Sequence, residues 1–505
     1  MTFNSIEFAI FLPVVFLLYW IVFDLLVKHN RHQLKLQNLF VLLASYLFYG
    51  WWDWRFLVLI IFTSFCSWVS GIWMQQVSIK SANGVGTEGN DRYAQSNRAS
   101  KTRKIIAASN IVINLLILCI FKYYNFFVTE FAKLFSISQD FLLLKIILPV
   151  GISFYTFQAL SYSIDVYKGK LKPTKDIIAF FTYIAFFPQL VAGPIERATN
   201  LLPQFLVKRK FDYALAADGM RQILWGLFKK IAVADNCAVF VNHVFSTYTE
   251  QTGCNLLLAA ILFTFQIYGD FSGYSDIAIG TSKLFGIRLM QNFKTPYFSR
   301  DIAEFWRRWH ISLTTWFRDY VYIPLGGSRV SKAKVVRNTF AIFLISGLWH
   351  GAGWTFIAWG AYHATLFLPL ILTNKNRKYL NQVASGRSLP NMKEIGQMAA
   401  TFFLVLVGWI LFRSESISQF WNYLCGMWQW GTLRAAYRCF TMWEVRAPIL
   451  LALLMLVVEW IQRNKEHGLQ IGHMHWAIRY PIYIIFIIAI IFFYSQPVTF
   501  IYFQF

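Results

Sequence analysis

The chain has 505 residues, of which 57% are hydrophobic and 14% are charged, and its formal net charge is +23. Its 50 phenylalanines and 20 tryptophans far exceed the usage of soluble domains, so the composition excludes an ordinary soluble protein. The basic residues cluster between apolar runs, as they do in the cytoplasmic loops of membrane proteins, and this excludes nucleic acid as the partner of the charge.

Apolar runs near the length needed to cross a bilayer recur from one end of the chain to the other. They cover residues 8–27, 36–49, 56–74, 105–121, 141–162, 256–267, 340–372, 399–412, 449–461 and 482–494. This pattern predicts an all-α polytopic membrane protein with about ten crossings. We expect one integral-membrane domain, residues 1–505, surrounded by membrane lipid.

The loop charges predict the orientation of the chain. The first run is expected to be a retained helix and not a cleaved signal, because the first lysine, Lys28, follows it. Basic loops at 28–32, 80–104 and 374–393 are expected on the cytoplasmic side, which places both termini outside. The Ser-, Asn- and Gly-rich composition within 78–104 predicts a mobile cytoplasmic loop.

Two segments do not fit simple alternation across the membrane. Residues 177–192 and 340–372 each begin and end beside basic loops, and each has a polar or helix-breaking motif in its middle. Such segments are typical of hairpins or re-entrant helices, which are tolerated at membrane depth where protein or a cavity surrounds them.

Two histidines carry the strongest functional signal. His310 ends the sequence FWRRWH, in a segment with a partly helical period, and His350 lies in SGLWHGAGW, inside an apolar run. A titratable group at membrane depth is costly, so a functional role is the expected reason for it. An imidazole can take a proton from a hydroxyl and return it to a leaving group, and with the aromatic walls of Trp306 and Trp349 this favours acyl transfer.

The alternative chemistries are weaker. A metal bound by the two histidines needs a third ligand, for which Glu304 and His363 are the candidates, but we expect no metal. The six cysteines show no CxxC spacing. Cys425 and Cys439 could form a disulfide if their loop faces an oxidising compartment.

Arginines near His310 allow two readings. Guanidinium groups bind phosphates through paired hydrogen bonds, so Arg307, Arg308 and Arg318 are candidates to hold the phosphates of an acyl donor. They could equally be the ordinary positive charge of a cytoplasmic loop.

Several motifs together resemble the membrane-bound O-acyltransferase family, in particular its bacterial branch of alginate and peptidoglycan O-acetylation proteins and D-alanyl exporters of teichoic acid. The motifs are FLPVVF (11–16), SYLFYGW (45–51), LPVGISFYTFQ (148–158), FPQLVAGPI (187–195), YGDFSGYSD (268–276), the block 305–329 and GLWHGA (347–352). The resemblance implies a ring of tilted helices around a central tunnel, with His350 as the principal catalytic residue and His310 assisting it. Asp270, Asp276 and Gln158 are candidate tunnel-wall residues, with helix–helix hydrogen bonding as the alternative.

The resemblance also implies a relay. An acyl group, expected to be acetyl, comes from cytoplasmic acetyl-CoA or another activated donor, with no bound cofactor. It passes through the bacterial inner membrane to an extracytoplasmic or membrane-anchored acetyltransferase, which modifies a polysaccharide. The alternatives are a D-alanyl or other acyl exporter, a transporter, and an assembly subunit without catalysis.

The last nine residues, 497–505, form an aromatic tail with the sequence PVTFIYFQF. Pro497 ends the last apolar run, so we expect the tail outside the membrane. It is similar to the aromatic C-terminal motif of the small partner protein of D-alanyl exporters, which makes Tyr502 a candidate acyl acceptor. The alternative is an interfacial aromatic belt.

Overall fold

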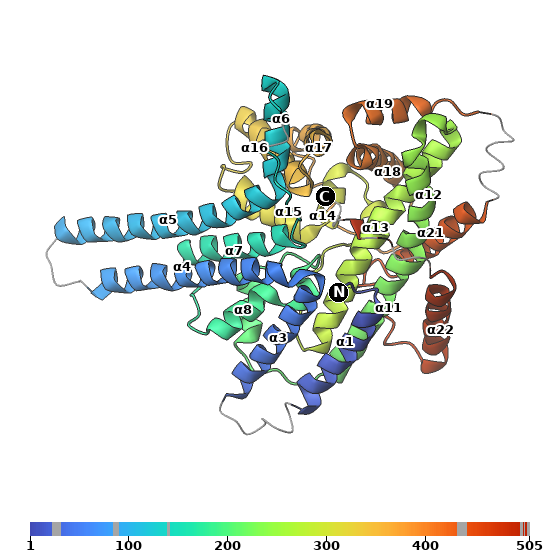
Figure 1. The fold of residues 1–505 in the computed structure, drawn as a ribbon. Helices are drawn as coiled ribbons and strands as arrows, with labels where there is room; N and C mark the ends of the chain where they lie inside the picture. Colours follow the sequence, from blue (N-terminus) through green and yellow to red (C-terminus); the bar gives the residue numbers. More distant parts are fainter. Residues whose placement is uncertain are drawn as a thin grey trace. The chain divides into compact units, whose positions relative to one another are not determined.

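The computed structural model describes residues 1–22, 32–83, 90–138, 142–431, 442–494, 498 and 500–501, with backbone alone at 82–83 and 90–96. Within these residues every regular element is a helix, which confirms the predicted all-α class (Figure 1). Among the described residues, five helical segments are long and apolar enough to cross a membrane: Gln33–Ser81, Asn97–Phe135, Gly253–Leu284, Trp354–Leu372 and Met392–Arg413. Shorter apolar helices lie at Ile6–Ile21 and Trp476–Phe492.

The chain divides into two compact units. The first unit comprises Met1–Ala216 and Ser282–Leu289, and the second comprises Ala217–Thr281 and Met290–Phe505. Each unit is described by itself below.

The first unit is a set of helices that pack through both apolar and polar side chains. It contains α1 (Ile6–Leu17), α3 (Gln33–Asp53), α4 (Leu57–Asn83), α5 (Asn90–Leu118), α6 (Tyr124–Phe135), α7 (Ile152–Tyr167), α8 (Ile177–Ala185), α9 (Phe187–Leu190) and α10 (Ala198–Phe205). Helices α4 and α5 run side by side in Figure 1 and both contact α7. Buried Asn110 on α5 donates to Ser67 of α4 and to Ser163 of α7, at 3.2 and 2.6 Å. Such hydrogen bonds join helices in an apolar surround.

The interrupted segment 177–192 is a broken helix. Helix α8 ends at Ala185, and the four-residue α9 begins at Phe187 with Pro188 at its start. A proline at this position lacks the N–H that would continue α8, and its ring would clash with the carbonyl of Ile184. The proline therefore explains the break.

The second unit contains every residue of both histidine motifs. Its helices are most of α11 (Tyr213–Leu227), the π-helix η4 (Phe228–Ala234), α12 (Asp235–Ser246), most of α13 (Gly253–Leu284), α14 (Ile302–Arg308), α15 (Ile311–Phe317), α16 (Lys332–His350), α17 (Trp354–Leu372), α18 (Met392–Arg413), α19 (Ile417–Gly426), α21 (Trp443–Ile461) and α22 (Trp476–Phe492).

Helices α16 and α17 form a hairpin over the segment 340–372, as the sequence indicated, and its turn is residues 351–353. Glycines bring the two helices into backbone contact. A Cβ on Gly347 would lie 2.2 Å from the carbonyl oxygen of Phe356, and one on Gly360 would lie 2.3 Å from that of Phe343. The hairpin therefore requires glycine at both positions, and it carries His350 at its tip.

Candidate functional site

His310 lies in the turn between α14 and α15. Helix α14 starts where Asp301 caps it, because the carboxylate accepts the backbone N–H of Glu304 at 2.7 Å. The helix ends after Arg308, although the sequence favours a partly helical period through this segment. The turn buries His310 to 1% exposure.

Long-range backbone hydrogen bonds account for the break. Two of these bonds join the turn to the segment that precedes α14. The N–H of Ile311 donates to the carbonyl of Asn292 at 2.8 Å, and the N–H of Lys294 donates to the carbonyl of Arg308 at 3.0 Å. His310 itself takes a left-handed backbone conformation, with φ 44° and ψ 56°. Non-glycine residues adopt this region infrequently, and such conformations cluster at functional sites.

His350 is the last residue of α16, and the backbone becomes extended at Gly351. A Cβ on Gly351 would lie 2.1 Å from the ring of Phe356, so glycine is needed for the chain to turn here. His350 is 4% exposed and packs edge-on against Trp359 and Phe412, with ring centroids 5.1 and 5.4 Å away. These rings fix the plane of the imidazole.

The structure brings the two predicted histidines together. Their ring centroids are 6.5 Å apart, and Trp349 contacts both rings, at 5.8 Å from His310 and 4.9 Å from His350. Phe271 of α13 also packs against His310, with ring centroids 4.7 Å apart. Two imidazoles held by aromatic rings at this separation can act on the same small group.

Further aromatic rings pack next to this pair through Trp359, which contacts His350 at 5.1 Å. Trp306 of α14 contacts Trp359 at 5.6 Å and His363 at 5.0 Å. His363 is fully buried against the backbone of Gly408, where a Cβ would lie 2.7 Å from its Nε2. Trp306 thus contacts Trp359, which in turn contacts His350.

The close approach of α16 and α17 gives a stability prediction. Gly347→Ala should destabilise the protein by about 1–3 kcal/mol, because the added methyl collides with backbone that cannot rotate away. Gly396→Ala on α18 is the matched control, since nothing lies within 4 Å of its added Cβ, and the better helix propensity of alanine should make it neutral or slightly stabilising. Thermal unfolding in detergent tests both. Equal melting temperatures for the two variants would contradict the backbone contact.

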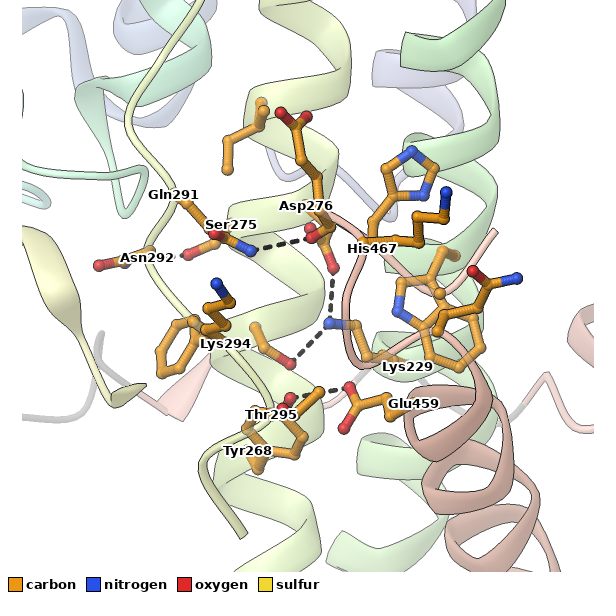
Figure 2. Close-up of a pocket in the computed structure, with 18 residues that line it drawn as sticks. Lys229, Tyr268, Ser275, Asp276, Gln291, Asn292, Lys294, Thr295, Glu459 and His467 are labelled. Atoms are coloured by element: carbon orange, nitrogen blue, oxygen red, sulfur yellow. Dashed lines mark hydrogen bonds and ion pairs between the residues drawn. The ribbon is translucent and has the colours of Figure 1, made fainter. Parts of the chain in front are cut away.

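Asp276 borders a small polar cavity of ≈ 30 Å³ (Figure 2). Lys229 forms an ion pair with Asp276 at 2.6 Å and donates to Ser272 at 2.9 Å. Tyr268 donates to buried Glu459 at 2.7 Å. The cavity has room for water and a polar lining of both charges, so it can solvate charged groups inside an apolar unit.

Asn292 joins this cavity to the turn of His310. Its side chain lines the cavity and donates to Ser275 at 3.1 Å, while its Oδ1 accepts the hydroxyl of Ser312 at 2.9 Å. The cavity wall and the left-handed turn are therefore one hydrogen-bonded structure.

Buried lysines are the residues that sequence reasoning missed. Lys229 and Lys230 lie in η4 and are 2% and 3% exposed. Lys230 is paired with Asp235 at 2.8 Å and with Asp270 at 2.7 Å. Two adjacent lysines in the mostly apolar stretch 223–244 were the available signal, because charge at membrane depth marks functional positions.

The three arginines proposed for donor phosphates have protein partners. Arg307 donates to the carbonyls of Asn376 and Tyr379, at 2.5 and 2.7 Å. Arg308 pairs with Glu304 at 2.8 Å. Arg318 is largely exposed and pairs with Asp319 at 2.7 Å. Arg307 and Arg308 thus hold the backbone around α14, whereas Arg318 is the one that faces outward.

The remaining predicted residues lie elsewhere. Gln158 is buried on α7 in the first unit, whereas both histidines belong to the second. Tyr502 and Cys439 lie outside the described residues, and Cys425 is exposed with a free thiol. Across the described part of the chain, His, Cys, Asp and Glu side chains form no group of three suited to a metal ion. Glu304, once a candidate ligand, is paired with Arg300 and Arg308.

Comparisons with known proteins give the family. The sequence profile of the membrane-bound O-acyltransferase family matches residues 173–380, which include both histidines. The probable alginate O-acetylase AlgI of Pseudomonas aeruginosa is 39% identical over 436 residues, which are 86% of this chain and 76% of that protein. The peptidoglycan O-acetyltransferase of Helicobacter pylori is 30% identical over 98% of this chain and 95% of its own. The teichoic acid D-alanyltransferase of Bacillus subtilis is 31% identical over 53% and 69%, respectively.

These similarities extend over most of the chain, and the helical structure agrees with a multi-pass membrane protein. The chain belongs to the membrane-bound O-acyltransferase family and is an O-acyltransferase of the membrane.

Proposed function

We propose that this protein relays an acyl group, acetyl in the first instance, from a cytoplasmic thioester to a polysaccharide outside the cell. The donor is acetyl-CoA or another activated acyl thioester. The group leaves through an extracytoplasmic or membrane-anchored acetyltransferase that modifies the polymer. The names of the relatives support acetyl as the transferred group and a polysaccharide as its acceptor, since they include a probable alginate O-acetylase and a peptidoglycan O-acetyltransferase.

The observation that carries the proposal is the buried histidine pair. The rings of His310 and His350 lie 6.5 Å apart among aromatic side chains. A hydroxyl acceptor between them can give its proton to one imidazole while the other hydrogen-bonds to the reacting carbonyl.

The transfer has two balanced steps. In the first, His350 takes the proton of the Tyr502 phenol, whose oxygen attacks the thioester carbon. The C–S bond breaks, an aryl ester forms, and the proton leaves with the thiol. In the second, a hydroxyl of the partner or polymer attacks the aryl ester, and the phenol regains its proton. A phenol suits this role because its pKa near 10 makes it a better leaving group than an aliphatic alcohol.

Mass spectrometry of the purified protein tests the relay. Incubation with acetyl-CoA should add one acetyl group, located on the C-terminal peptide that contains Tyr502. A protein that releases free CoA but never carries an acyl adduct would contradict the covalent step.

D-alanyl transfer is the second candidate, favoured by the similarity to teichoic acid D-alanyltransferases. The two candidates differ in the mass added to the C-terminal peptide in cells, which is one acetyl or one alanyl group. An alanyl adduct with no acetyl adduct would reassign the acyl group and leave the relay intact.

The relay needs a defined orientation in the bacterial inner membrane. We propose that residues 78–104 face the cytoplasm and that both termini lie outside, following the charge of the loops. Ser100→Cys, on the exposed part of α5, and Trp54→Cys, between α3 and α4, provide a matched pair. An impermeant maleimide should label the Trp54→Cys variant at position 54 in intact cells, and the Ser100→Cys variant at position 100 only after lysis. Mass spectrometry of the labelled peptides reads both positions. The opposite pattern would reverse the direction of the relay.

A further inference from the structure

The described end of the C-terminal tail is buried within the second unit. Phe500 and Ile501 are each 3% exposed. The backbone N–H of Ile501 donates to Oδ2 of Asp270 at 2.7 Å, and Nζ of Lys230 donates to the carbonyl of Val498 at 3.1 Å. The protein therefore holds this part of the tail through its main chain.

The side chains that hold the tail form a compact charged cluster. Lys230 is paired with Asp235 and Asp270, and all three side chains are 4% exposed. One ammonium faces two carboxylates, so the cluster has an excess of acceptor capacity. Buried charges are costly unless further hydrogen bonds satisfy them, and the Ile501 N–H supplies such a bond to Asp270. The tail therefore supplies a hydrogen-bond donor that the two carboxylates of the cluster need in addition to Lys230.

Close packing of α13 on η4 builds this site. Gly269 and Gly273 lie on either side of Asp270 in the chain. A Cβ on Gly269 would lie 2.8 Å from the carbonyl of Lys229, and one on Gly273 would lie 3.0 Å from the N of Lys230. The two glycines let Asp270 reach Lys230, which is on a π-helix, a distortion that is frequent at functional sites.

The tail is also adjacent to the histidine pair. The ring of Phe500 packs on Tyr274 at 4.7 Å and on Phe271 at 6.0 Å. Phe271 in turn packs on His310 at 4.7 Å. One aromatic ring therefore separates the docked tail from a catalytic imidazole, and Tyr502 follows Ile501 directly in the chain.

We propose that Lys230, Asp235 and Asp270 form a receptor for the tail main chain, here called the tail latch. Its ligand is the tail main chain, recognised through the C=O group of Val498 and the N–H group of Ile501. The latch holds Tyr502 at the histidine site while acyl groups are loaded and removed. The three residues act as positioning residues, and this role rests on the proposed carrier function of the tail.

Thiol labelling of the full-length protein tests the latch. In a parent carrying Ile501→Cys, the buried thiol should react slowly with a maleimide, measured by mass spectrometry of the C-terminal peptide. Asp270→Ala removes the acceptor and leaves a neutral Lys230–Asp235 pair, so the tail should be released. Loss of one charge-assisted hydrogen bond should raise the labelling rate about tenfold or more. Asp270→Asn retains an amide oxygen as acceptor and should give an intermediate rate.

Asp276→Ala is the matched control. Asp276 is on the same helix and has its own lysine partner, Lys229 at 2.6 Å, but the tail's described hydrogen bonds go to Asp270 and Lys230. This variant should leave the labelling at position 501 slow. Equal acceleration by Asp270→Ala and Asp276→Ala, or none by Asp270→Ala, would overturn the latch.

The carrier role of Tyr502 and the tail latch are tested by different variants, so one hypothesis can be refuted while the other stands. Adding Tyr502→Phe to the Ile501→Cys parent should leave labelling slow, because the latch contacts the main chain. Normal acylation by Tyr502→Phe would refute the carrier, yet faster labelling at position 501 in Asp270→Ala would still support the latch.

Discussion

Replacement of His350 by alanine should abolish acyl transfer while the protein stays folded. His350 lies at the tip of the α16–α17 hairpin with its ring held by Trp359 and Phe412. Loss of a general base typically lowers the rate by about 10²- to 10⁴-fold. His310→Ala should also reduce transfer, but less severely. Polymer acylation in cells and the acyl adduct of the purified protein measure both effects.

His363→Ala is the control for these variants. It removes an equally buried imidazole that packs on Trp306 and Trp359. We expect it to retain the acyl adduct at matched protein levels. Near-normal acylation by His350→Ala, or loss in His363→Ala alone, would show that the catalytic imidazole has been misassigned.

Replacement of Tyr502 by phenylalanine should eliminate polymer acylation without loosening the tail. The change removes one hydroxyl and keeps the ring. Anchoring by Phe500 and Ile501, both 3% exposed, is unaffected, and each fully buried apolar side chain contributes about 1.5–3 kcal/mol. The variant therefore separates the chemistry from the docking of the tail.

Tyr494→Phe serves as the comparison, because this tyrosine is close in sequence and half exposed. It should acylate normally. If cells with Tyr502→Phe also acylate normally, the tail is an aromatic plug and the acyl carrier belongs to another chain.

The sequence predicted the parts of this protein that depend on local composition. Most of the long apolar runs form helices, so the helical class and the α16–α17 hairpin followed from the pattern. The run 141–162 is an exception, because residues 143–149 have no regular structure and α7 begins only at Ile152. A shared site for His310 and His350 was expected from the family resemblance, which implies a central tunnel that holds both histidines. Their rings lie 6.5 Å apart.

Features that depend on distant partners could not be predicted. The end of α14 is set by backbone hydrogen bonds that Arg308 and Ile311 make with Lys294 and Asn292. These partners lie outside the helical segment, so the sequence of the segment itself contains no signal for the break. Arg308 was a candidate phosphate ligand because guanidinium groups bind phosphates through paired hydrogen bonds. It pairs instead with Glu304, one helical turn earlier, and the sequence alone does not show whether that carboxylate faces Arg308 or solvent. Nothing in the sequence around Asp270 indicates that its carboxylate accepts the backbone N–H of Ile501, 231 residues further along the chain.

The left-handed backbone of His310 limits what can replace it. At φ 44° most side chains are strained, whereas asparagine and aspartate, like histidine, populate this region several times more often than other residues. Glycine adopts it at no steric cost. The backbone conformation of the turn therefore restricts this position to a few residue types, whatever chemistry the side chain performs. His310→Asn keeps the turn and replaces the imidazole with an amide, so it tests the role of the ring without deforming the backbone. Isoleucine or valine would deform the turn itself.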